Sequence, residues 1–149
     1  MIVAVAVLSL LCLGNLLLTL GLARRINEQE PPAVLLPPGS VVDVALEPPT
    51  LVGFFSPGCG PCQERLPDFV ARARRAPAGR TLAVVVGDAA DTMVASLTGA
   101  ASVVVEPRGG TLATAFGVRG FPAFALVGEH GRIEASGSDL ASIPQLVAA

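Results

Sequence analysis

Cys59 and Cys62 stand three residues apart in the sequence Cys59-Gly60-Pro61-Cys62, a spacing that suits dithiol–disulfide chemistry. An apolar run of strand length, residues 50–55, precedes the motif, and a pattern with helical periodicity follows it. A thiol at a helix N-terminus faces unpaired N–H groups and the positive end of the helix dipole, which lower its pKa from about 8.5 toward about 7. Because the thiolate is the attacking form of cysteine, the motif is a candidate redox centre.

The two cysteines are expected to have different roles. Cys59 lies at the exposed start of the predicted helix, so we expect it to attack a partner disulfide. Cys62 lies one turn later on the same side and is placed to resolve the mixed disulfide. Pro61 suits the first helical turn, where a missing N–H costs nothing, and Gly60 completes the motif. The alternative is a pair of buried structural cysteines, but the strand, turn and helix patterns agree around the motif and argue against it.

The composition excludes several other functions. The chain has 149 residues, enough for one domain, and a net charge of −2, so it lacks the basic surface that nucleic-acid binding requires. Structural zinc needs four Cys or His ligands, and beyond the cysteine pair the globular part offers only His130, which we expect to be a surface turn residue. We therefore predict no metal site and no cofactor other than the redox-active cysteine pair itself.

The N-terminal segment predicts a membrane anchor. Residues 1–23 carry no charged side chain, and a helix of that length spans about 34 Å, enough to cross a hydrocarbon core of about 30 Å. We therefore expect residues 1–24 to form one transmembrane helix that contacts the lipid bilayer through residues 1–23. A cleaved signal peptide is the alternative, but it would carry a positive n-region and a shorter apolar core.

Residues 25–40 combine Glu28 and Glu30 with two proline pairs. Since proline cannot continue a helix, this segment is predicted to be a semi-extended linker. Arg24 and Arg25 follow the apolar run directly, and the positive-inside rule places such residues in the cytoplasm. That rule alone would leave the following domain in the cytoplasm as well.

From residue 41 to residue 149, β-rich and helical patterns alternate, which predicts an α/β domain with parallel crossovers. Residues 128–131 supply a hairpin turn between the last two strands. We expect strands over 50–55, 81–86, 101–105, 123–127 and 132–136, and helices over 61–75, 91–97, 110–116 and from about residue 139 onward.

The run VRGFP, which ends in Phe121 and Pro122, lies directly before the predicted strand 123–127. Proline is allowed at a strand start, and X–Pro is the only bond type that commonly adopts the cis form. With the cysteine motif, this run makes the chain resemble the thioredoxin superfamily, in which a cis-proline loop faces the C-x-x-C motif and helps hold the substrate peptide. The resemblance implies that Pro122 is that proline and that Phe121 is the preceding residue, which tunes partner choice.

The resemblance covers about residues 41–149 and is closest to the membrane-tethered TlpA/ResA-like and MauD-like branch. Three features support that branch: the anchor, the stretch P-G-C-G-P-C-x-x-x-x-P through Pro67, and a helix and strand inserted between Val86 and Thr111. It implies a thioredoxin-like three-layer α/β fold, with a central mixed sheet, helices on both faces and a TlpA-type insertion.

Three positions depart from the family pattern. Gly58 stands where thioredoxins carry a tryptophan, and Gly53 stands where they carry a buried aspartate. In the ResA-like branch a glutamate three residues after the second cysteine assists proton transfer. That position is Arg65 here, and Glu64 comes one residue early, so its side chain is expected to point elsewhere.

The resemblance implies a thioredoxin-like disulfide reductase, since the Gly-Pro dipeptide between the cysteines resembles that of reducing thioredoxins. We expect it to act on a protein client and to be re-reduced by a protein electron donor. Relatives usually hold this domain outside the cytoplasm, and we expect the same here, against the indication of Arg24 and Arg25. Two alternatives stay open: a MauD-like maturation factor for one client, and a thioredoxin-fold binding module with little turnover.

Overall fold

The computed structural model describes residues 1, 4, 7, 9, 11–19, 34–88 and 90–146 of the chain. The chain divides into two compact units, Met1–Pro32 and Ala33–Ala149. In the first unit, residues 11–19 are helical. Across the described residues, no helix has both the length and the apolar character that a membrane crossing requires. Much of the predicted anchor, 1–24, and of the predicted linker, 25–40, lies outside the described residues, so the anchor stays a prediction.

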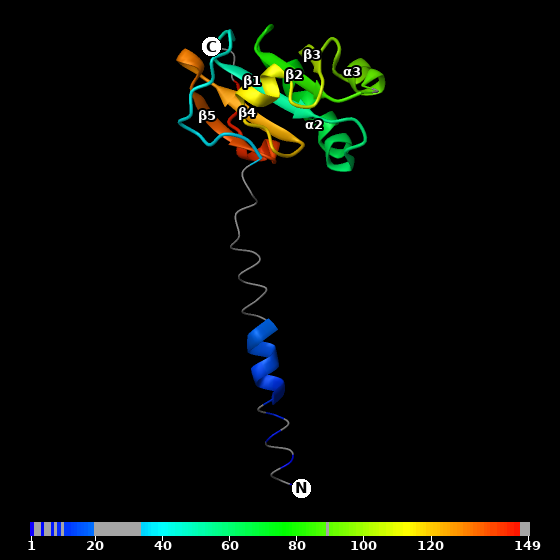
Figure 1. The fold of residues 1–149 in the computed structure, drawn as a ribbon, viewed down its shortest axis with the longest axis vertical. Helices are drawn as coiled ribbons and strands as arrows, with labels where there is room; N and C mark the ends of the chain where they lie inside the picture. The colour runs from blue at the N-terminus through cyan, green and yellow to red at the C-terminus, as the bar shows by residue number, and fades with distance from the viewer. Residues whose placement is uncertain are drawn as a thin grey trace. The chain divides into compact units, whose positions relative to one another are not determined.

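A five-stranded sheet forms the centre of the second unit, in the order β3-β2-β1-β4-β5 (Figure 1). The central strand β1 pairs in parallel with β2 and antiparallel with β4, and β2 pairs in parallel with β3. The sheet is therefore mixed, as the sequence predicts. The strands are β1 Thr50–Phe55, β2 Thr81–Val86, β3 Ser102–Glu106, β4 Ala123–Val127 and β5 Ile133–Gly137.

Helices cover both faces of the sheet. Helices α2 (Gly60–Arg75) and α3 (Asp91–Leu97) pack on one face, and α4 (Thr111–Ala115) packs on the other. Neighbouring side chains of a strand point to opposite faces of the sheet. Because the end of β1 is wholly apolar, both faces present apolar side chains that helices must cover. Phe55 belongs to the core on the α2 side, and Phe54 belongs to the core on the α4 side. The predicted three-layer α/β fold is confirmed.

Within the predicted domain, residues 41–149, the elements before the last helix are confirmed in type and order. Strands β3 and β5 begin one residue later than predicted, at Ser102 and Ile133, because the residue before each forms only an isolated bridge. The predicted turn 128–131 contains a 3-10 helix, η1 (Glu129–Gly131), in which His130 is exposed and has a φ of 56°. His130 is thus the surface turn residue that the sequence predicts.

The predicted closing helix from residue 139 is wrong. Within residues 138–146, which the structure describes, only a single 3-10 turn forms, η2 (Leu140–Ser142). Asp139 caps this turn by accepting a hydrogen bond from the backbone N–H of Ala141 at 3.1 Å. Pro144 then ends it, since proline has no N–H with which to continue a helix.

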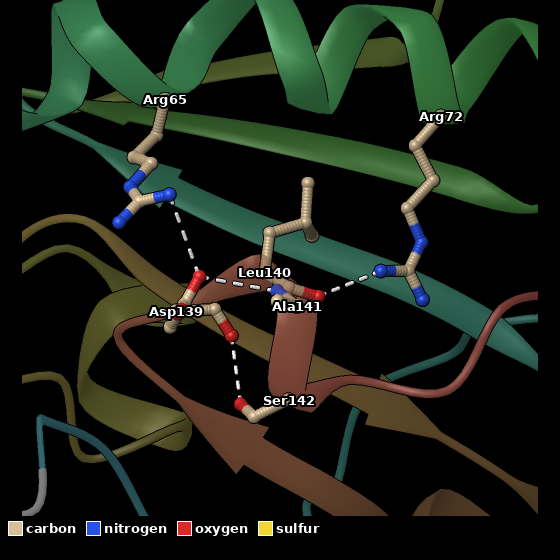
Figure 2. A network of polar contacts seen from close by, with 6 residues as sticks. All are labelled: Arg65, Arg72, Asp139, Leu140, Ala141 and Ser142. Carbon is tan, nitrogen blue, oxygen red and sulfur yellow. Dashed lines mark hydrogen bonds and ion pairs between the residues drawn. The ribbon is translucent and has the colours of Figure 1, made fainter.

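Arg72 of α2 holds this closing segment against the domain. Its guanidinium donates to the carbonyl oxygen of Leu140 at 2.7 Å (Figure 2), and also to those of Ile143 and Pro144. Burial lowers the pKa of Arg72, but a guanidinium stays charged at neutral pH. The irregular C-terminal backbone therefore obtains from a side chain the hydrogen bonds that a helix would have supplied.

The folded unit also includes residues that the sequence assigned to the linker. The backbone N–H of Leu36 donates to the carbonyl of Phe116 at 3.0 Å, and that of Arg119 donates to the carbonyl of Val34 at 2.7 Å. Leu35 between them is buried in the core on the α4 side. Residues 34–36 thus belong to the folded unit and not to the linker, because Leu35 packs in the same core cluster as Ala113 of α4.

Candidate functional site

The cysteine motif lies where β1 ends and α2 begins, as the sequence predicts. After Phe55 the chain turns, and the backbone N–H of Cys59 donates to the carbonyl of Ser56 at 3.2 Å. Gly58 in this turn has a φ of 76°, a conformation that side chains with a Cβ rarely adopt. The turn therefore favours glycine at the position where thioredoxins carry tryptophan.

Cys59 and Cys62 form a disulfide, so the structure represents the oxidised protein. Cys59 is the N-cap residue of α2, and its sulfur accepts a hydrogen bond from the backbone N–H of Cys62 at 3.2 Å. Cys59 is half-buried, whereas Cys62 is 0% exposed. This asymmetry leaves only the first sulfur open to a large partner.

The start of α2 is electrostatically suited to a thiolate. Pro61 occupies the first turn without the loss of an intrahelical hydrogen bond, and no acidic side chain lies in that turn, which is described in full. A negative charge on Cys59 would therefore meet backbone N–H groups and the positive end of the helix dipole without a competing carboxylate. Gly60 places no side chain over the sulfur, and an added Cβ there would meet open space.

The loop before β4 brings the second predicted part of the site beside the first. Ala123 pairs with Phe54, so the loop residues just before β4 lie beside the end of β1. The bond between Phe121 and Pro122 is cis, and the carbonyl oxygen of Phe121 lies 3.6 Å from the sulfur of Cys59. Fold topology thus joins residues that are 62 positions apart in the sequence.

Aromatic rings fill the space beneath the redox centre. Phe55, Phe69 and Phe124 pack together with ring centroids 5.0–5.9 Å apart, in the same core cluster as Cys62. A Cβ added to Gly53 would lie 2.6 Å from a ring carbon of Phe69. The Phe69 ring therefore fills the space that a side chain at position 53 would occupy.

The helix surface beside the cysteines supplies no substitute carboxylate next to Cys62. Glu64 is exposed, and Arg65 pairs with Asp139 at 3.6 Å, as Figure 2 shows. Among the described residues, the only buried charged side chain is Glu106, which belongs to a different part of the domain. Within the part of the chain that the structure describes, no carboxylate is buried in the core cluster that contains Cys62.

Glu106 is a positioning residue that sequence reasoning missed. Its carboxylate accepts hydrogen bonds from the backbone N–H groups of Leu112 at 3.0 Å and Ala113 at 2.7 Å, and so caps the start of α4. Gly110 leaves room for it, because an added Cβ there would lie 2.5 Å from the carboxyl carbon. The available signal in the sequence was an acidic residue directly after the predicted strand 101–105, followed closely by Gly109 and Gly110.

Arg108 and Arg119 were also missed. Both are exposed and line a groove of about 640 Å³ that reaches Ser56 and Phe121 beside the redox centre. Arg119 belongs to the same VRGFP run as Phe121, which was the signal in the sequence. Among the described residues, no group of three His, Cys, Asp or Glu side chains is placed to hold a metal ion.

No protein-family model matches the chain, and no curated protein matches it either. Several solved structures, in contrast, are similar to the chain. MTB DsbF, solved in mixed oxidised and reduced forms, is 23% identical with a TM-score of 0.53, over 63% of this chain and 72% of that one. A secreted Mycobacterium tuberculosis disulfide oxidoreductase homologous to E. coli DsbE is 16% identical with a TM-score of 0.51, over 68% and 73% of the two chains. A putative thioredoxin from Neisseria meningitidis is 23% identical with a TM-score of 0.52, over 72% and 78%.

Likeness at these identities concerns the fold. It agrees with the mixed sheet and with the helices on both of its faces. The domain of this chain has a thioredoxin-like fold, and its Cys59–Cys62 disulfide lies where β1 ends and α2 begins.

Proposed function

We propose that the chain is a thiol–disulfide oxidoreductase that reduces disulfides of a protein client through Cys59 and Cys62. The observation that carries this proposal is the asymmetric disulfide at the start of α2, in which Cys59 is partly exposed and Cys62 is fully buried. Two further observations support it: the thioredoxin-like fold, and the loop of Phe121 and Pro122 beside the sulfur of Cys59.

The reaction consists of two exchanges. In the reduced protein, the thiolate of Cys59 attacks one sulfur of the client disulfide, so a bond forms between protein and client while the client S–S bond breaks. The second client sulfur leaves as a thiolate and takes a proton from water. Cys62 then loses its proton and attacks the sulfur of Cys59, which releases the first client sulfur. Two electrons pass to the client, and the protein is left with the Cys59–Cys62 disulfide.

Proton transfer from Cys62 distinguishes this centre from its relatives. Because the Phe69 ring fills the space beside Gly53, no buried carboxylate among the described residues lies near Cys62 to receive its proton. Water or the departing client thiolate accepts it instead. We therefore expect the second exchange to be slower than the first, so that mixed disulfides accumulate.

A protein electron donor completes the cycle by reducing the Cys59–Cys62 disulfide with its own dithiol. The Gly60-Pro61 dipeptide, which resembles that of reducing thioredoxins, favours the reductive direction over oxidation of clients. The net direction depends on the reduction potential of the pair relative to those of donor and client.

The proposed cellular setting is a single-pass membrane protein whose catalytic domain lies outside the cytoplasm. The uncharged run 1–23 supports the anchor, and the following charged, proline-rich residues up to Pro32 suit a spacer. An extracytoplasmic domain of this kind would belong with TlpA/ResA-like reductases or, if it serves one client, with MauD-like maturation factors.

A binding module with little turnover is the second candidate, and the Phe69 ring that fills the space beside Gly53 favours it. Reduction of insulin disulfides by the full chain with excess dithiothreitol separates the two candidates. An oxidoreductase gives multiple turnovers that Cys59→Ser abolishes. A rate equal to that of dithiothreitol alone would favour the binding module.

A further inference from the structure

A groove runs from the redox centre across the α4 side of the domain. It has a volume of about 640 Å³, within the range of about 300–1,000 Å³ that is typical of ligand sites. Ser56 and Phe121 line its end beside Cys59, since Ser56 accepts the hydrogen bond of the Cys59 backbone and Phe121 places its carbonyl 3.6 Å from the sulfur. A chain bound in the groove would therefore pass next to the reacting sulfur.

Two arginines give this groove a positive charge. Arg108 lies in the loop between β3 and α4, and Arg119 lies in the loop between α4 and β4, so they approach the groove from different segments. Both are exposed, and neither forms an ion pair with another residue that the structure describes. A guanidinium without a partner carboxylate is available to bind one from outside.

No acidic side chain of the described residues lines the groove. Glu106 lies nearby in sequence, but its carboxylate oxygens are occupied by the N–H groups of Leu112 and Ala113. Asp88 follows the lining residue Val86 closely but is not part of the lining. The remaining lining includes apolar side chains such as Val118 and the hydroxyl group of Thr114, which suit an extended peptide.

We propose that this groove binds an acidic segment of the client protein, with aspartate or glutamate side chains a few residues from the cysteine that Cys59 attacks. The proposal rests on the oxidoreductase function proposed above and specifies its substrate class. Carboxylates near the attacked sulfur would pair with Arg108 and Arg119 and place the client disulfide against Cys59. Charge complementarity of this kind raises association rates and selects among partners.

The test measures attack by Cys59 on model clients. Three peptides each carry one cysteine as a pyridyl disulfide and differ only in flanking residues, which are glutamate, glutamine or lysine. The probe protein is the full chain in detergent with the Cys12→Ser substitution, reduced and freed of reductant. Release of the pyridinethione, followed by absorbance at several peptide concentrations, gives the second-order rate constant of the first exchange.

We expect the glutamate peptide to react about tenfold faster than the glutamine peptide at low salt, and the advantage to shrink as salt is added. The double variant Arg108→Gln/Arg119→Gln should lose that advantage, so that its rates with the glutamate and glutamine peptides become about equal. The matched control Arg75→Gln/Arg132→Gln removes the same charge from exposed positions away from the groove and should keep the preference.

Three results would overturn the proposal. Equal rates for the three peptides would remove the acidic preference while leaving the oxidoreductase intact. If the double variant reacted more slowly with all three peptides by the same factor, the arginines would act on the sulfur of Cys59 rather than on the client. A preference that emerges only after Glu28→Gln/Glu30→Gln would assign the groove to the chain's own spacer. If no peptide reacts, the oxidoreductase function itself fails.

Discussion

The sulfur of Cys59 lies 3.6 Å from the backbone carbonyl oxygen of Phe121. In the reduced protein, a Cys59 thiol can donate a hydrogen bond to this oxygen, whereas a thiolate would be repelled by it. The backbone N–H of Cys62, 3.2 Å from the same sulfur, favours the thiolate instead. The Phe121 carbonyl therefore disfavours the thiolate of Cys59, whereas the start of α2 favours it. The reactivity of Cys59 depends on the balance of these two effects.

The first prediction concerns the order of alkylation. In reduced protein carrying Cys12→Ser, iodoacetamide should modify Cys59 at least about tenfold faster than Cys62, because only Cys59 is accessible and at the helix N-terminus. Peptide mass spectrometry of timed samples measures both rates. The Cys12→Ser background is needed because Cys12 is an exposed free thiol. Equal rates across the pH range would show that the assigned roles are wrong.

The second prediction concerns Gly53. Gly53→Ala should lower the free energy of unfolding by about 1–3 kcal/mol, because the new Cβ would overlap the Phe69 ring. Gly60→Ala is the matched control, since its Cβ meets open space and alanine favours a helix, so stability should be unchanged or rise by up to about 1 kcal/mol. Urea denaturation measures both. Equal effects of the two substitutions would contradict the close packing at Gly53.

The third prediction concerns Glu106. Glu106→Ala should lower the free energy of unfolding by about 1–3 kcal/mol, because the N–H groups of Leu112 and Ala113 lose their acceptor. Glu106→Gln keeps one acceptor oxygen and should cost less. The exposed Glu129→Ala is the control, with an expected change within about 0.5 kcal/mol. If Glu106→Ala and Glu129→Ala gave the same urea midpoint, the capping role would be untenable.

The fourth prediction concerns the membrane side of the domain. Alkaline phosphatase fused after Ala149 should be active, because that reporter works only when exported and the proposed site of the domain is outside the cytoplasm. A fluorescent cytoplasmic reporter at the same position is the control and should be dark. The opposite pattern would place the domain in the cytoplasm, as Arg24 and Arg25 alone would suggest.

Local pattern was enough to predict the parts of the fold that are defined by local sequence. The apolar runs of β1, β2 and β4 gave the strands, and the motif around Cys59 gave the helix start. The end of the chain was not predictable in this way. Its apolar residues were compatible with a helix, but Pro144 and the hydrogen bonds from Arg72 make it irregular, and those bonds join residues about seventy positions apart.

The candidate site was predicted only as far as its motifs reach. Cys59, Cys62, Phe121 and Pro122 could be named because family motifs mark them. The filling of the space beside Gly53 by the Phe69 ring could not be seen, since it depends on how that ring packs. The VRGFP run pointed to Arg119, but its place in one groove with Arg108 could not be predicted, because the fold brings two separate loops together there.

The most direct test of the central claim is to trap the mixed disulfide with Cys62→Ser. Without the second thiol, Cys59 should remain bonded to its client, and mass spectrometry of complexes purified from the native host should find client cysteines joined to Cys59 and released by dithiothreitol. Cys59→Ser/Cys62→Ser is the control and should yield none. An oxidoreductase predicts these Cys59-linked adducts. Their absence, with the variant folded and Cys59 open to iodoacetamide, would contradict the account.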